Sequence, residues 1–193
     1  MAEQFAVIVE PVSTGHEYAE AFRAEGLTPI AVMTSDAAVP VFAHTWHPEN
    51  FDRVHVLGGR SVAELAAELR PYRPQWLVPG SEVGVELCDA LTGILCPDSG
   101  NDPATTPDRR DKWHMARALA RAGLPHLRQH CSADRAELDA WIAEQGLAGG
   151  RFVVKPPKSA ATDDVHLIRP GEDWHPVFDR ILGKINYGGP RAG

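Results

Sequence analysis

The chain has 193 residues, of which 19 are basic and 26 are acidic, so its formal net charge is −7. This length suits one large domain or two small ones, and the acidic surplus argues against a nucleic-acid-binding protein, because phosphate backbones attract basic surfaces. The 44% of hydrophobic residues is enough to build a core without disulfides or a structural metal.

The cysteines and the N-terminus bear on the cellular compartment. The three cysteines, Cys88, Cys96 and Cys131, form no C-x-x-C pair, and we expect unpaired, buried thiols in a reducing cytosol. The first residues lack the basic head of a secretion signal, and no apolar run approaches the ~20 residues of a membrane span. We therefore expect a soluble cytoplasmic protein without membrane contacts.

Apolar runs alternate with helical patterns through the first hundred residues. We expect strands at 5–9, 27–33, 53–57, 75–78 and 94–96. Apolar residues recur at helical spacing between these strands, as in Val62, Leu65, Ala66 and Leu69. A βαβα order of this kind predicts an α/β fold, with a mostly parallel sheet and helices on both faces.

The segment 97–107 is the richest in turn-forming residues, and we place a domain boundary there. Beyond the boundary we expect a helix at 108–122, a strand at 127–131, a helix at 132–145, strands at 151–155 and 165–168, and a last helix at 173–182.

Several well-known site patterns are missing from the sequence. The turn after the first strand, Glu10 to Gly15, holds a single glycine where a dinucleotide site would carry G-x-G-x-x-G. Neither a P-loop motif nor a G-x-S-x-G elbow occurs. The histidine pairs 44/47 and 126/130 lack nearby cysteines or carboxylates at a suitable interval, so we expect no metal site.

Lysine is rare in this chain, which has 15 arginines and four lysines, at positions 112, 155, 158 and 184. Lys155 ends an apolar strand, where its ammonium needs a partner, and a compact ammonium suits the oxygens of a polyphosphate. The loop that follows, 156–164, offers small residues and hydroxyls that can hold phosphate. The alternatives are an ordinary salt bridge for each lysine and a plain hairpin.

Taken together, five segments resemble the ATP-grasp family, and most closely its amino-acid ligase branch, the bacterial carboxylate–amine ligases. The resemblance follows the family order over most of the chain, and its most specific feature is a pair of lysine motifs 43 residues apart. The segments that carry it are 79–85, Asn101, 109–115, 122–125 and 153–157 followed by a small-residue loop and Val165.

The resemblance implies a Rossmann-like, parallel-sheet pre-ATP-grasp domain at 1–105, followed by an incomplete α+β ATP-grasp lobe at 106–193. It implies that Lys112 and Lys155 contact the phosphates of ATP, with Lys155 also near the adenine. Glu82 would face the substrate. The loop residues that would cover the phosphates are Ser159, Ala160, Ala161, Thr162 and Asp163.

The chain also departs from the family pattern. Ala161 and Asp164 stand where the family usually has glycine, and a carboxylate at 164 beside Asp163 would repel a triphosphate unless it points away. The sequence ends where the family's second lobe would begin. That lobe would bring the adenine hinge and the Glu and Asn ligands of Mg²⁺, so we assign neither catalytic residues nor metal ligands here.

These observations predict the N-terminal part of an ATP-dependent carboxylate–amine ligase that acts through an acyl phosphate. We expect no turnover from this chain alone. Its partners would be ATP with Mg²⁺ and a small carboxylic acid or amino acid, in a homodimer or with a partner chain that supplies the missing lobe. The alternative is a non-catalytic module, derived from an ATP-grasp protein, that binds a metabolite or another chain.

Overall fold

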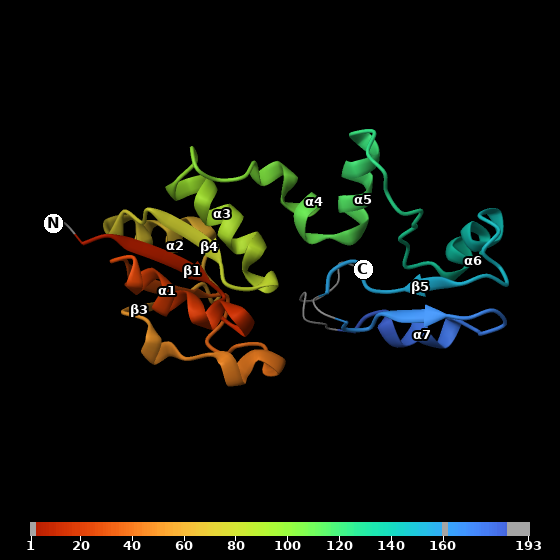
Figure 1. Cartoon of the computed structure of the whole chain (residues 1–193), viewed down its shortest axis with the longest axis horizontal. Helices are drawn as coiled ribbons and strands as arrows, with labels where there is room; N and C mark the ends of the chain where they lie inside the picture. The colour runs from red at the N-terminus through yellow and green to blue at the C-terminus, as the bar shows by residue number, and fades with distance from the viewer. Residues whose placement is uncertain (1–2, 160–161, 185–193) are drawn as a thin grey trace. The chain divides into compact units, whose positions relative to one another are not determined.

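The computed structural model describes residues 3–159 and 162–184. It divides into two compact units, residues 1–106 and 107–193, which are coloured from red to green and from green to blue in Figure 1. The identity of these units as a pre-ATP-grasp domain (1–105) and a first ATP-grasp lobe (106–193) stays a prediction.

The N-terminal unit is built on a four-stranded parallel sheet. Its strands are β1 (Phe5–Val9), β2 (Thr28–Met33), β3 (Arg53–Val56) and β4 (Trp76–Pro79), in the order β3-β2-β1-β4. Helix α1 (Tyr18–Ala24) packs on one face of the sheet, and α2 (Val62–Leu69) and α3 (Val85–Leu95) pack on the other. The predicted doubly covered parallel sheet is therefore confirmed.

The unit has two hydrophobic cores, one on each face of the sheet, because successive side chains of β1 point to opposite faces. Val7 and Val9 point to the α2 and α3 side, where they meet Leu65 and Leu91, while Ile8 points to α1. All of these side chains have 0% exposure. A strand buried on both faces needs apolar residues at every position, which explains the unbroken run at 5–9.

Short 3-10 helices fill most of the connections in this unit. They are η1 (Ser13–Glu17), η2 (Pro40–Thr45), η3 (Pro48–Asn50), η4 (Arg70–Tyr72), η5 (Glu82–Gly84) and η6 (Pro103–Thr105). The helix η1 touches the turn before η5, because a Cβ on Gly15 would lie 2.1 Å from the carbonyl oxygen of Gly80. Open α/β sheets bind ligands at such a switch between strands, and here main-chain atoms fill the space between β1 and β4.

The C-terminal unit contains helices and one antiparallel strand pair. Its helices are α4 (Thr106–Arg110), which begins at the boundary, α5 (Lys112–Arg121), α6 (Arg135–Glu144) and α7 (His175–Ile181), and its strands are β5 (Phe152–Val154) and β6 (His166–Ile168). Its core consists of Ile168, Trp174 and Phe178, with part-buried side chains from α6 and β5 around them. The core therefore covers one face of the β5–β6 pair.

Four local predictions were wrong. Residues 94–96 are not a strand, because α3 continues to Leu95 and the amide of Cys96 still bonds to the carbonyl of Thr92 at 2.8 Å. Residues 127–131 form no strand with any part of the chain that the structure describes. The helix expected at 108–122 is broken at Asp111, whose extended backbone and capping side chain begin α5. Cys131 is exposed, whereas Cys88 is buried.

Among the described residues, no helix is both long and apolar enough to pass through a membrane.

Candidate functional site

Lys155 follows β5 on the face of the hairpin that the core leaves open. Val153 and Leu167 lie opposite each other in the strand register, and they are 50% and 52% exposed. Since side chains alternate along a strand, Lys155 continues the side of Val153. Its exposed side chain has no hydrogen bond or ion pair to another described residue. The open face therefore combines an apolar surface with a free ammonium at one end.

Lys112 is the first residue of α5 and is held by its surroundings. The helix begins there because the Oδ1 atom of Asp111 accepts hydrogen bonds from the amides of Trp113 and His114 at 2.8 and 3.0 Å. The Lys112 ammonium donates to the carbonyl oxygen of Ser159 at 2.9 Å, and its amide donates to that of Pro157 at 3.0 Å. The structure thus joins Lys112 to the predicted phosphate loop.

The described part of that loop is partly buried. Pro156 is buried and Ser159 is 4% exposed, so the loop packs closely against the unit as it leaves β5. On its far side, Thr162 is exposed and Asp163 is half-buried. Ala160 and Ala161, the two other predicted loop contacts, lie outside the described residues.

The carboxylate at 164 has a specific partner. Its Oδ2 atom accepts a hydrogen bond from the Lys184 ammonium at 2.7 Å, and its Oδ1 atom lies 3.8 Å from Nε2 of His166. The hydrogen bond from Lys184 holds the pKa of Asp164 below its usual range. Asp164 has φ = 53°, in the left-handed region that favours glycine, so the chain keeps a glycine-like turn while its added charge is compensated.

Glu82 lies in the N-terminal unit, at the carboxyl end of β4. Its side chain is exposed at the start of η5. The neighbouring Ser81 hydroxyl donates to the carbonyl oxygen of Glu10 at 2.9 Å, and a Cβ on Gly84 would lie 2.4 Å from the Val9 carbonyl oxygen. These contacts fix the turn that carries Glu82. The four lysines belong to the other unit.

The described residues include no group of three or more histidine, cysteine or acidic side chains placed to hold a metal ion. His130 instead has a structural position, since its ring stacks on Trp141 with centroids 5.6 Å apart and meets the edge of Trp113 at 5.8 Å. His47 lies 6.2 Å from His16, ring to ring, and its Nδ1 atom is 3.2 Å from Glu49.

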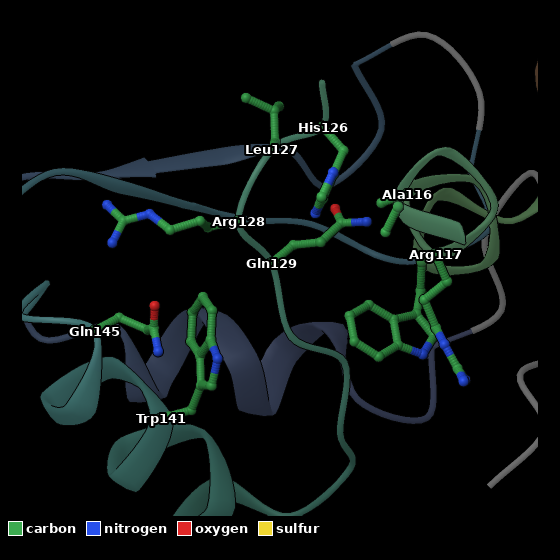
Figure 2. Close-up of a pocket in the computed structure, with 10 residues that line it drawn as sticks. Ala116, Arg117, His126, Leu127, Arg128, Gln129, Trp141 and Gln145 are labelled. Carbon is green, nitrogen blue, oxygen red and sulfur yellow. The ribbon is translucent and has the colours of Figure 1, made fainter. Parts of the chain in front are cut away.

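A separate groove of about 230 Å³ lies between α5, α6 and the segment 126–129. Figure 2 shows Trp141 reaching from α6 toward this segment. Arg117 packs over the Trp113 ring at 5.8 Å. None of the predicted nucleotide contacts lines this groove, so the groove is distinct from the surface that Lys155 occupies.

Sequence reasoning missed two features of the site. The first is the apolar pair Val153 and Leu167, which the alternation with Lys155 could have indicated. The second is the ion pair between Asp164 and Lys184. No local sequence pattern predicts it, because the two residues are 20 positions apart.

No family model matches this chain. In sequence it is 27% identical over 187 residues to dapdiamide A synthase of Enterobacter agglomerans, an alignment that covers 97% of this chain and 44% of that protein. The chain therefore spans less than half the length of this curated relative.

Solved structures share the fold. N5-carboxyaminoimidazole synthetase from Staphylococcus aureus, complexed with ADP, matches with a TM-score of 0.62 at 14% identity, over 93% of this chain and 46% of that one. A second N5-carboxyaminoimidazole ribonucleotide synthetase, also an ADP complex, matches with a TM-score of 0.63 at 14% identity, over 92% and 44%. The sequence match along nearly the whole chain and the shared fold agree with the predicted resemblance to the N-terminal portion of an ATP-grasp enzyme.

Proposed function

We propose that this chain supplies the phosphate-binding surface of an ATP-dependent carboxylate–amine ligase. In the complete enzyme, a carboxylate oxygen of the substrate attacks the γ-phosphorus of ATP and ADP leaves. An amine then attacks the acyl carbon of the resulting acyl phosphate, and inorganic phosphate leaves as the amide bond forms. The sequence similarity to a synthase and the fold shared with two ADP-bound synthetases support this proposal.

The observation that carries the proposal is the free ammonium of Lys155 at the end of an open apolar face. A nucleotide offers both matching parts, a flat base for the surface formed by Val153 and Leu167 and charged phosphates for the ammonium. The charge of the unit agrees with an anionic ligand, because residues 107–193 contain 14 basic and 11 acidic side chains whereas residues 1–106 contain 5 and 15.

The remaining predicted contacts keep the roles that the resemblance implies. Lys112 and the loop residues Ser159, Thr162 and Asp163 would border the phosphates, together with Ala160 and Ala161, and Glu82 would face the acid substrate. Mg²⁺ is part of the expected chemistry, but no described cluster of side chains fits it, and we assign it no step on this chain.

The proposal extends to partners and location. The expected partners are ATP and a small carboxylic acid or amino acid, with a homodimer or a partner chain supplying the second lobe, and without nucleic acid or membrane contacts. The sequence has three cysteines and no C-x-x-C pair, which suits a reducing compartment, and we propose the cytoplasm.

The test is calorimetric titration of the chain with ATP and Mg²⁺. We expect weak binding, and we expect Lys155→Met to lower the affinity by about tenfold or more, since bonds from a charged donor are worth ~1.5–3 kcal/mol. Arg151→Met is the matched control, because it removes an exposed positive charge from the opposite end of β5. Its affinity should stay within about twofold of the wild type.

The other outcomes separate the two candidate functions. Equal losses in the Lys155 and Arg151 variants would show that the unit attracts ATP by net charge alone. No heat with ATP, together with a stable complex or oligomer in size-exclusion chromatography, would favour the non-catalytic module. ADP release by this chain, abolished by Lys155→Ala, would contradict our prediction that it does not turn over by itself.

A further inference from the structure

Lys112 connects three segments of the C-terminal unit through three different groups. Its amide donates to the Pro157 carbonyl oxygen at 3.0 Å, and its own carbonyl oxygen accepts from Nε2 of Gln129 at 2.7 Å. Its ammonium donates to the carbonyl oxygen of Ser159 at 2.9 Å and lies 3.3 Å from the Ser159 hydroxyl and 3.5 Å from the Pro157 carbonyl oxygen. The side chain therefore follows the loop main chain for three residues.

The loop needs such an anchor because of its sequence. Pro156 and Pro157 have no amide hydrogen, so the chain after β5 cannot continue a ladder of backbone hydrogen bonds. Its carbonyl oxygens still require donors where they are buried, and Ser159 is 4% exposed. The Lys112 ammonium, with three hydrogens to donate, satisfies these acceptors.

The position of Lys112 at the start of α5 carries an electrostatic cost, which the loop contacts help to offset. A cation in the first turn of a helix opposes the helix dipole, and the partial negative charges of the loop carbonyls offset that repulsion. Lys155 differs in this respect, since its side chain is exposed and bonds to no other described residue.

We infer that Lys112 has a second task before nucleotide arrives: it is the positioning residue that holds loop residues 157–159 in place. Lys155 has no such task in the nucleotide-free chain, because its side chain bonds to no other described residue. The inference rests on the proposed function for its ligand, but the anchoring exists without one. Because the Lys112 amide stays bonded to Pro157, the loop keeps one tether when the ammonium turns toward a phosphate.

Trypsin provides a local reporter of this anchoring. The enzyme cleaves after lysine unless proline follows, so the Lys155–Pro156 bond resists it and the Lys158–Ser159 bond does not. Local cleavage reports how often the segment opens. In the nucleotide-free chain, Lys112→Met should speed cleavage of the Lys158–Ser159 bond by about tenfold or more, because the hydrogen bonds of the ammonium are lost. Mass spectrometry of the fragments measures the cleavage rate.

Two variants make the test specific. Lys112→Arg keeps the charge and the donors and should restore slow cleavage, and Lys155→Met should leave the nucleotide-free rate unchanged. ATP should protect the Lys158–Ser159 bond in the wild type but not in the Lys112→Met variant. An unchanged rate in Lys112→Met would overturn the inference, as would acceleration of the same size in Lys155→Met.

A substitution that removes fewer contacts keeps the test valid if Lys112→Met destabilises the whole unit. If Lys112→Met speeds cleavage at every arginine and lysine of the unit, Ser159→Ala decides the matter, since it removes only the hydroxyl contact at 3.3 Å. We expect about a threefold increase at Lys158 alone, and no increase would overturn the inference. Faster cleavage in Lys112→Met combined with no ATP binding by the wild type would leave the anchoring established and reject the proposed function.

Discussion

The two units of the chain differ in how completely they cover their sheets. In the N-terminal unit, helices enclose both faces of the parallel sheet, and β1 is buried from Ala6 to Val9. In the C-terminal unit, the core covers one face of β5 and β6, and the other face exposes Val153 and Leu167. All four lysines lie in this second unit. Under the proposed function, the first unit is chiefly a scaffold and the second offers the surface for an anionic ligand.

The largest expected effect tests how closely the segments after β1 and β4 pack in the N-terminal unit. Gly15→Ala would place a Cβ 2.1 Å from the Gly80 carbonyl oxygen, in contact with main-chain atoms that cannot turn aside. The turns after β1 and β4 would have to separate, and we expect a loss of about 4 kcal/mol or more in the free energy of unfolding. Chemical denaturation, followed by circular dichroism, measures this loss.

Gly59→Ala is the matched control, because a Cβ at that position meets no atom within 4 Å and its φ is not in the left-handed region. It should change stability by less than about 0.5 kcal/mol. Equal effects of the two substitutions would mean that the turns after β1 and β4 are not in close contact.

The next effect compares a buried side chain with one on the open face. Leu65→Ala removes a side chain with 0% exposure from the core beneath α2, and we expect a loss of about 3 kcal/mol. Val153→Ala, on the open face of β5, should cost less than about 1 kcal/mol. The same variant should weaken ATP binding in calorimetry if the face receives the base. A large loss of stability from Val153→Ala would mean that this face is packed rather than open.

The fold was predictable where the pattern was regular. The run at 5–9 and the helical spacing of Val62, Leu65, Ala66 and Leu69 reflect burial directly, and the structure places both as expected. The apolar residues at 94–96 were ambiguous, because a short apolar run suits either a strand or the end of a buried helix. The segment 127–131 has the composition of a strand, but strand formation requires a pairing partner, which local sequence does not specify.

The site was predictable where it depends on local sequence. Lys155 was singled out because an unusual residue follows an apolar strand, and the structure has that strand as β5. The start of α5 at Lys112 was not expected, because the predicted helix ran from 108 to 122 and Asp111 breaks it. The contact between Lys112 and Ser159 joins residues 47 positions apart, and the pairing of Asp164 with Lys184 joins residues on either side of β6 and α7. Such pairings follow from tertiary packing and leave no periodic signal.

The ion pair at Asp164 gives a smaller, pH-dependent effect on the C-terminal unit. Asp164→Ala removes the bond to Lys184 and leaves a residue poorly suited to φ = 53°, and we expect a loss of about 1 kcal/mol at neutral pH. Asp164→Asn tolerates the left-handed backbone better and should lose less. Thermal unfolding of both variants separates the contribution of charge from that of backbone conformation.

The sign of the pH dependence follows from the depressed pKa of Asp164. A carboxyl group whose pKa is lower in the folded state stabilises the fold above its ordinary pKa of about 3.9. This contribution is lost as the pH falls through the depressed value, so the difference between wild type and Asp164→Asn should shrink in acid. A difference that grows toward low pH would contradict the ion pair.

The last prediction concerns the reactivity of two cysteines rather than stability, and it compares the buried core of the first unit with an exposed position in the second. Burial raises the pKa of Cys88, in the core beneath α3, to about 11, whereas Cys131 is exposed in the C-terminal unit. At pH 8 only about one Cys88 thiol in a thousand is the reactive thiolate, and iodoacetamide should modify Cys131 first, as mass spectrometry would show. Cys131→Ser should remove the fast phase. Equal rates at Cys88 and Cys131 would mean that the scaffold core opens readily, and the contrast between the two units would fail.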